Sequence, residues 1–362
     1  MQLQSLQVRQ YRNLQEIAVD TSAQFVVFHG DNGQGKTNLI EAICSLATLR
    51  SFRTHRVADQ IRWGQDEAFI SGKIEDEGHV RELRLKLNKN GRKSTIDGKS
   101  PANLSNYFES IRAIVFAPQH VELVRGAPQQ RRDFLDRGCF TLQPHYLESF
   151  RTFKKLLSQR SALLRNQNFD LMQMEVLEDQ LAVAGAYISI KRQRLVEGLV
   201  EPFVSVHTHL TGQSTVGIRY RSTLGEGDES ERAEKFRMMM RERRDEEILR
   251  GSSLVGPQRD DLIVSLKEKN ARAFASQGQS RALVIALKLA ELDLAQKRGV
   301  YPLFLLDDLS SELDAIRRGR LVEILHEKAI QIFVSTTNLS ILEKSVENML
   351  QYQVVEGQIS GI

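Results

Sequence analysis

FVVFHGDNGQGKT, residues 25–37, is the most informative stretch of this 362-residue chain. Its apolar beginning, Phe25–Phe28, predicts a buried strand, and its last eight residues match the phosphate-binding pattern G-x-x-x-x-G-K-[ST]. A helical pattern follows directly over Asn38–Leu49. A strand, a glycine-rich loop and a helix in this order form a P-loop, whose backbone N–H groups and helix N-terminus attract phosphate. A glycine-rich turn that matched by chance would not need both flanking elements, so the stretch predicts a nucleoside triphosphate site.

The residues of this loop have distinct expected roles. Lys36 would reach the β- and γ-phosphates, and the hydroxyl of Thr37 would ligate Mg²⁺. The other expected nucleotide-binding residues of the loop are Gly30, Asp31, Asn32, Gly33, Gln34, Gly35 and Asn38.

Composition is typical of a soluble globular protein of two or three domains. No apolar run is long enough to span a bilayer, and the N-terminal MQLQSLQVRQ lacks the apolar segment of a signal peptide. The two cysteines, Cys44 and Cys139, have no metal-ligand spacing. A cytoplasmic protein without a membrane partner is therefore expected. The net charge of +4 permits nucleic-acid binding but does not demonstrate it.

Two β-rich segments flank the P-loop in sequence. Leu3–Val8 and Ile17–Val19 have the pattern of strands, and the turn between them contains Arg12 and Asn13. These two residues either lie near the nucleotide or are ordinary turn residues. Residues 69–101 alternate apolar and charged side chains and contain Asn-Gly and Asp-Gly turn signals. They predict an antiparallel β-meander packed beside the nucleotide core.

Two basic segments are candidates for contact with DNA phosphates. One is the arginine-rich loop after the P-loop helix, which would touch the nucleotide or a phosphate backbone, and the other is the tip of the β-meander. Solvated charged loops have the same sequence pattern. The candidate residues are Arg50, Arg53, Arg56, Lys89, Arg92 and Lys93. Base-specific readout is not expected, because no DNA-reading motif of known geometry occurs.

The middle of the chain changes to helical periodicity. Ile111–Phe116 predicts a strand, and the Gln119 that follows it would hold Mg²⁺ or the attacking water. Arg131 to about Leu249 is mostly helical, and the nucleotide core is expected to resume with a strand at Leu262–Leu266. The predicted domains are a head formed by 1–130 and 251–362, and an inserted helical domain formed by 131–250.

A second anion site is predicted where Ser276, Gln277, Gly278 and Gln279 fit S-x-G-Q. A strong helical pattern follows over Ala282–Gln296, so the free N–H groups of a helix N-terminus would face the anion.

Two further strands are predicted to end in polar residues. The apolar run 301–306 leads into Asp307, which would hold Mg²⁺, and Asp308, which would orient or deprotonate the attacking water. The run Ile330–Val334 leads into a polar segment, where Thr336 or Thr337 would sense the γ-phosphate.

P-loop, S-x-G-Q and strand-Asp-Asp in this order resemble the ABC-type ATPases. That resemblance implies an α/β ABC-type P-loop ATPase head, with an antiparallel β subdomain and an inserted α-helical arm. It implies ATP and Mg²⁺ as cofactors. It also implies a head-to-tail homodimer, in which Ser276, Gly278 and Gln279 of one subunit cap the γ-phosphate bound by the other. Arg12 would contact nucleotide, as the corresponding motif does in related heads.

Within that group the chain closely resembles the RecF family from end to end. The segments that carry the resemblance are 6–13 (LQVRQYRN), 30–38 (GDNGQGKTN), 51–54 (SFRT), 131–136 (RRDFLD), 256–262 (GPQRDDL), 276–279 (SQGQ) and 306–314 (LDDLSSELD). Gln258 departs from the family, which commonly has histidine at that position, and this leaves the role of its loop open.

The resemblance implies an ATP-dependent DNA-binding protein of recombinational repair and replication restart. Such proteins dimerise on ATP, favour gaps and single-strand/double-strand junctions, and act with RecR and RecO to place RecA on DNA. Their slow, DNA-stimulated hydrolysis of ATP serves as a switch.

Two other functions share parts of this pattern. An ATPase subunit of an ABC transporter would need a coupling surface for a membrane partner, and the Asp307-Asp308 pair points away from it. The ATPase half of an overcoming-lysogenization-defect nuclease would need an acidic metal-binding domain after residue 362. The absence of sustained heptads argues against the SMC and Rad50 proteins.

Overall fold

The structure, a computed structural model, describes residues 1–166, 170–309, 313–343, 345–346 and 348–361. The chain divides into two compact units. The first contains residues 1–121, 205–214 and 275–362, and the second contains residues 122–204 and 215–274. The predicted Ser-Ser-Glu segment at 310–312 lies outside the described residues.

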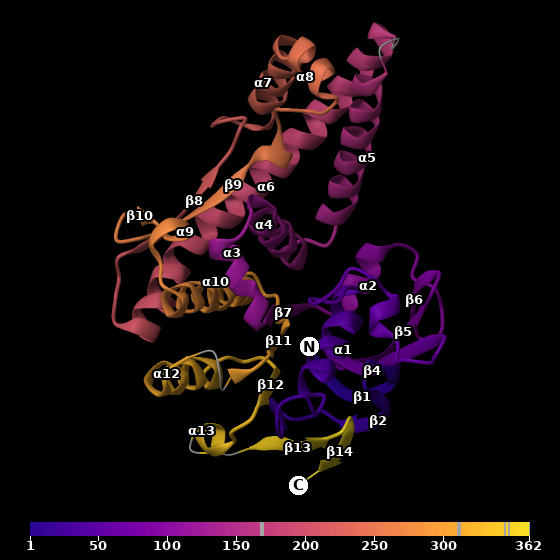
Figure 1. Cartoon of the computed structure of the whole chain (residues 1–362), viewed down its shortest axis with the longest axis vertical. Helices are drawn as coiled ribbons and strands as arrows, with labels where there is room; N and C mark the ends of the chain where they lie inside the picture. Colours follow the sequence, from indigo (N-terminus) through magenta and orange to yellow (C-terminus); the bar gives the residue numbers. More distant parts are fainter. Residues whose placement is uncertain (167–169, 310–312, 344, 347, 362) are drawn as a thin grey trace. The chain divides into compact units, whose positions relative to one another are not determined.

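The first unit contains a six-stranded sheet with the order β14-β13-β3-β12-β11-β7. Figure 1 labels β7, β11, β12, β13 and β14 of this sheet. Its strands are β3 (Phe25–His29), β7 (Ala113–Phe116), β11 (Leu303–Leu306), β12 (Ile332–Thr336), β13 (Met349–Val355) and β14 (Gln358–Gly361). All neighbours pair in parallel except β13 and β14. Parallel strands end at the same edge of a sheet, so the residues that follow β3, β7, β11 and β12 meet there.

A second, antiparallel sheet in the same unit has the order β2-β1-β4-β5-β6. It consists of β1 (Gln2–Tyr11), β2 (Leu14–Asp20), β4 (Glu67–Asp76), β5 (His79–Asn88) and β6 (Gly91–Ile96). The predicted meander is confirmed, and β1 extends it by pairing with β4. Leu83, Leu85 and Leu87 alternate with exposed or half-exposed charges, as the sequence pattern predicts.

The P-loop helix α1 (Lys36–Thr48) packs against strands of both sheets. As a result, ten of its thirteen residues are buried, including the polar Glu41 and Ser45. Among the described residues of this unit, the other helices are α2 (Leu104–Ser110), α10 (Gln277–Lys297), α12 (Ala315–His326) and α13 (Ser340–Glu343), and the last residues of α6 (Leu171–Thr211), from 205 on, also belong to it. Two 3₁₀ turns, η1 (Ala58–Gln60) and η2 (Pro118–Val121), lie in its loops.

The second unit is mostly helical, as predicted, and also contains a three-stranded sheet. Its helices are α3 (Glu122–Arg125), α4 (Pro128–Leu142), α5 (Tyr146–Arg165), α7 (Glu229–Glu242), α8 (Arg244–Arg250) and α9 (Ala271–Phe274). Residues up to 204 of the long α6 (Leu171–Thr211) also belong to it. The sheet has the order β10-β9-β8, from β8 (Val216–Arg221), β9 (Asp261–Leu266) and β10 (Lys269–Asn270).

The strand predicted at Leu262–Leu266 is present as β9, but its partners differ from the expectation. It pairs with β8 and β10 rather than with strands of the six-stranded sheet. The second unit therefore ends at Phe274, whereas the sequence analysis predicted that the head domain begins again at residue 251. Pairing with β8 is the physical reason, because it joins the residues after 256 to the unit that contains β8.

Two segments that carried the family resemblance meet inside the second unit. Arg131 makes a bidentate ion pair with Asp261, at 2.6 and 3.0 Å. Arg192 makes another with Asp136, at 2.7 and 2.9 Å, and donates to the Pro257 carbonyl oxygen at 2.7 Å. The RRDFLD and GPQRDD segments are therefore joined by buried, charge-assisted hydrogen bonds. Within the described residues, no helix has the length and apolar character needed to cross a membrane.

Candidate nucleotide site

The P-loop connects β3 to α1 and leaves no space for a side chain at two of its glycines. Gly30 has φ 142°, and a Cβ placed on it would lie 2.4 Å from the Val354 carbonyl oxygen. Gly35 has φ 120°, and its Cβ would lie 2.9 Å from Asn13 Oδ1. Any larger residue would push the loop away from β13 or from the β1–β2 turn. The loop is thus held between these two segments.

Lys36 reaches back over its own loop. Its Nζ donates to the carbonyl oxygens of Gly30 and Asp31, both at 2.7 Å. Burial lowers the pKa of Lys36, and the charges of Asp308 and Asp307 oppose that shift. The ammonium group therefore lies within electrostatic range of both acids. An anionic phosphate oxygen would be a stronger acceptor for it than a neutral carbonyl.

Thr37 and Asp307 meet where β11 ends. Thr37 Oγ1 donates to Asp307 Oδ1 at 2.9 Å, and Ser335 Oγ donates to the same oxygen at 2.8 Å. Burial raises the pKa of Asp307, while these hydrogen bonds and the positive charge of Arg53 oppose the shift. A hydroxyl and a carboxylate in contact are ligands that suit Mg²⁺, so the residues present fit the predicted metal.

Ser335 connects both acids, a role that the sequence did not suggest. Besides donating to Asp307, its Oγ accepts the backbone N–H of Asp308 at 2.8 Å. Asp308 has a left-handed backbone, with φ 58°. The serine therefore fixes the carboxylate of one acid and the main chain of the other. In the sequence, Ser335 could have been identified by its position as the first polar residue after the apolar run of β12.

Gln119 and the two threonines lie at the ends of neighbouring strands. Gln119 lies in η2, after β7, and its Nε2 donates to the Phe52 carbonyl oxygen at 3.2 Å. The buried Thr336 bonds within its own turn, through Asn338 O at 3.0 Å and Asn338 N at 3.1 Å. Thr337 is exposed. The metal role of Gln119 and the sensing role of either threonine stay predictions.

The S-x-G-Q segment begins α10 with a reciprocal cap. Ser276 Oγ accepts the Gln279 N–H at 3.2 Å, and Gln279 Oε1 accepts the Ser276 N–H at 2.8 Å. Ser276 and Gln277 are exposed, and Gly278 is half-buried. The motif thus stabilises a helix N-terminus that is open to an anion. Its action on a second subunit's ATP stays a prediction.

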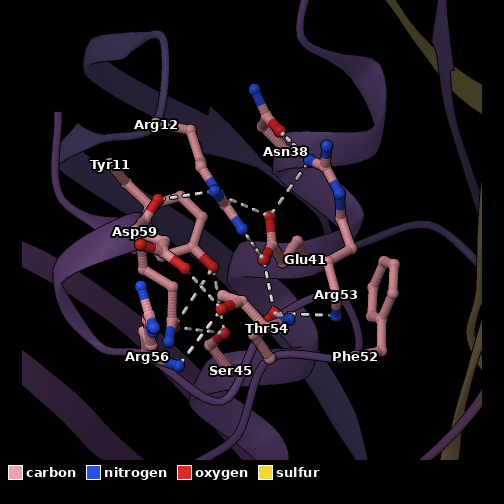
Figure 2. A network of polar contacts seen from close by, with 12 residues as sticks. Tyr11, Arg12, Asn38, Glu41, Ser45, Phe52, Arg53, Thr54, Arg56 and Asp59 are labelled. Carbon is pink, nitrogen blue, oxygen red and sulfur yellow. Dashed lines mark hydrogen bonds and ion pairs between the residues drawn. The ribbon is translucent and has the colours of Figure 1, made fainter. Parts of the chain in front are cut away.

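The β1–β2 turn lies against the P-loop through Asn13. Its Nδ2 donates to the Gln34 carbonyl oxygen at 3.1 Å, and its Oδ1 accepts from Asn38 Nδ2 at 2.7 Å. Figure 2 shows the neighbouring Arg12 directed at Glu41, which it contacts through Nε at 3.0 Å and Nη2 at 2.7 Å. The predicted turn residues therefore pack against the nucleotide loop and its helix.

The six candidates for DNA contact fall into two groups. Arg53 reaches the P-loop helix, where its Nη1 donates to Asn38 Oδ1 at 2.8 Å. All six side chains are exposed, and the other five are Arg50, Arg56, Lys89, Arg92 and Lys93. Lys89 contacts Asp66 at 2.7 Å. Their contact with DNA stays a prediction.

Comparison with known proteins gives matches over essentially the whole chain. A family model described as the RecF/RecN/SMC N-terminal domain matches residues 2–360. The DNA replication and repair protein RecF of Geotalea uraniireducens is 35% identical over 364 residues, which cover 99% of this chain and 100% of that protein. The protein of the same name from Geobacter sulfurreducens is 36% identical over 368 residues, with full coverage of both chains.

Solved structures support the same fold. The chain matches the structure of the recombination mediator protein RecF-ATP in the RecFOR pathway with a TM-score of 0.91 and 24% identity, over 100% of this chain and 97% of that one. It matches an Smc head domain from Pyrococcus furiosus with a TM-score of 0.59 and 14% identity, over 100% and 96% of the two chains. At these identities the likeness concerns the fold.

Proposed function

This chain belongs to the RecF family, and from that premise we propose that it is an ATP-dependent DNA-binding protein of DNA repair and replication. It binds ATP with Mg²⁺, dimerises on ATP, and binds DNA at gaps and single-strand/double-strand junctions. Slow hydrolysis of ATP then returns it to the monomer. The observation that carries the proposal is the contact between Thr37 in the P-loop and Asp307 after β11. RecF proteins match this chain along its full length, which supports the same proposal.

Nucleotide binding is supported by the groups that line the P-loop. Lys36 Nζ exchanges its two carbonyl acceptors for phosphate oxygens, which bind a cation more strongly. When bound, Mg²⁺ neutralises charge on the β- and γ-phosphates. Thr37 and Asp307, which are in contact, would hold it, and Gln119 after β7 would be the third ligand. Ser335 orients Asp307, because its hydroxyl donates to the carboxylate.

Hydrolysis requires a group that orients the attacking water, and we assign that role to Asp308. Its position is fixed by the Ser335 hydroxyl, which accepts its backbone N–H. The capped N-terminus of α10 in one subunit binds the γ-phosphate held by the other. Loss of that phosphate removes the anion that two positive helix ends share, so the dimer separates.

The DNA-related part of the proposal rests on the family. Relatives that this chain matches along its full length are named DNA replication and repair proteins, and a similarly folded structure is placed in the RecFOR pathway. We accordingly propose RecR and RecO as partners and the loading of RecA as the outcome. Exposed lysines and arginines of the first unit supply the phosphate contacts.

Binding to fluorescent gapped, single-stranded and blunt duplex DNA, with and without ATP–Mg²⁺, tests this function. The wild type should bind the gapped substrate in the presence of ATP, and Lys36→Ala should lose that dependence. RecR should strengthen binding to the gap. Equal binding of all three substrates regardless of ATP would contradict the proposal. If there is ATP hydrolysis but no DNA binding in low salt, the transporter-subunit alternative gains support.

A further inference from the structure

We propose that Glu41 is a positioning residue of the nucleotide site: its buried carboxylate holds Arg53, alongside Arg12, where the Arg53 guanidinium binds the phosphates of ATP. The proposal rests on the ATP-binding function above and adds two residues to that site. It moves Arg53 from the candidates for DNA contact to the candidates for nucleotide contact.

Glu41 lies in the second turn of α1, close to the residues that begin the helix. It is four residues after Thr37 and three after Asn38, so the three side chains share one side of the helix. Its side chain is fully buried, with 0% exposed. Figure 2 shows Arg12 and Arg53 directed at this carboxylate. Four donor atoms contact its two oxygens. They are Arg12 Nη2 at 2.7 Å, Arg12 Nε at 3.0 Å, Ser51 Oγ at 2.5 Å and Arg53 Nη1 at 3.4 Å.

The two arginines are held to different degrees. Arg12 makes a bidentate ion pair with Glu41 and also donates to the Asp59 carbonyl oxygen at 2.5 Å, so the orientation of its guanidinium is fixed. Arg53 makes one long contact with Glu41, and its side chain is 43% exposed. Among the residues that the structure describes, only Nη1 of its guanidinium has an acceptor. Arg53 therefore has donors left for an anionic ligand.

Arg53 lies close to the groups that hold the triphosphate. Its Nη1 donates to the side chain of Asn38, which follows Thr37 directly in the chain. Its charge also acts on the carboxylate of Asp307. A planar guanidinium at this position can bind two phosphate oxygens at once. The side chain is thus placed for nucleotide rather than for a distant DNA surface.

Glu41 also fixes the loop that carries Arg53. Ser51 Oγ donates to Glu41 and accepts the N–H groups of Arg53 at 2.9 Å and of Thr54 at 3.1 Å. The carbonyl oxygen of Phe52, the residue after Ser51, accepts a hydrogen bond from Gln119 Nε2 at 3.2 Å. One buried carboxylate therefore sets the backbone of 51–54, the direction of Arg53 and the segment that Gln119 contacts.

A double-mutant cycle on ATP affinity tests this role. Calorimetry of the full-length chain with ATP–Mg²⁺ would compare the wild type, Glu41→Gln, Arg53→Ala and the double variant. We expect each single change to weaken ATP binding about tenfold, because each removes charge-assisted contacts. The two losses should not add: the double variant should bind ATP within about twofold of Arg53→Ala, because most of the effect of Glu41 passes through Arg53. Additive losses would overturn the proposal.

Two controls separate positioning from stability. Glu178→Gln removes a similarly buried carboxylate that pairs with Arg160 in the second unit, and it should lower the melting temperature without changing ATP affinity. If Glu41→Gln does not fold, Arg53→Ala alone still decides, because that side chain is half-exposed. If Arg53→Ala binds ATP within twofold of the wild-type affinity but binds DNA more weakly, the proposal is overturned. A wild type that binds no ATP would instead refute the proposed function.

Discussion

Replacing Ser335 by alanine removes one hydroxyl that contacts both acids of the candidate nucleotide site. The lost hydrogen bonds are the donation to Asp307 Oδ1 and the acceptance from the Asp308 N–H, both at 2.8 Å. A hydrogen bond to a charged group contributes about 1.5–3 kcal/mol. If the loss of the bond to Asp307 appears fully in the transition state, turnover falls roughly tenfold to a hundredfold. The P-loop itself keeps all its contacts.

Phosphate release at saturating ATP–Mg²⁺ measures this effect, and ATP binding in EDTA isolates the metal-independent part. We expect kcat of Ser335→Ala to fall by the stated factor, while ATP affinity in EDTA stays within twofold of wild type. Ser45→Ala is a matched control, because this buried serine of α1 bonds to Tyr11 and Gln60 away from the two acids. A kcat for Ser335→Ala within twofold of wild type would refute the reasoning.

Three further outcomes are expected. Asp136→Ala leaves the fully buried Arg192 without its carboxylate and should lower the free energy of unfolding, measured in urea, by about 3–5 kcal/mol. Asp179→Ala, which breaks an exposed pair, should lower it by less than about 1 kcal/mol. Equal effects would contradict the argument that the buried pair is the more important one. Burial lowers the pKa of His207 below its usual 6.5, so the unfolded chain binds the proton first and stability should fall as pH drops below about 6.5. His207→Asn should flatten that part of the stability–pH curve, and an unchanged slope would count against it. Lys36→Arg should raise the ATP concentration needed for dimerisation, a prediction that fails if wild-type concentrations suffice.

The local motifs predicted the elements that form the candidate nucleotide site. The P-loop, the strand before Asp307 and the β-meander depend on short stretches whose spacing fixes turn, strand or helix. The meeting of the P-loop with Asp307 also follows from sequence, since both follow parallel strands, which end at one edge of a sheet. Thr37 and Asp307, which are far apart in the chain, are indeed in contact.

The parts that sequence missed depend on tertiary packing. Glu41 lies in a helix that both sheets cover, so its burial and its arginine partners arise from segments outside the helix. Ser335 could not be chosen over Thr336 without knowing which hydroxyl faces Asp307. The pairing of β9 with β8 was likewise not evident from sequence, because β8 lies some forty residues earlier, beyond two helices.

Light scattering of the purified protein, with and without ATP–Mg²⁺, tests most directly whether two chains share bound ATP. Wild type and Asp308→Asn should both have the monomer mass of 41.2 kDa without nucleotide and about twice that mass with it. The variant should keep the dimer longer, because it hydrolyses ATP more slowly. A mass that stays at the monomer value while ATP is bound would contradict the shared site and the role given to Ser276, Gly278 and Gln279.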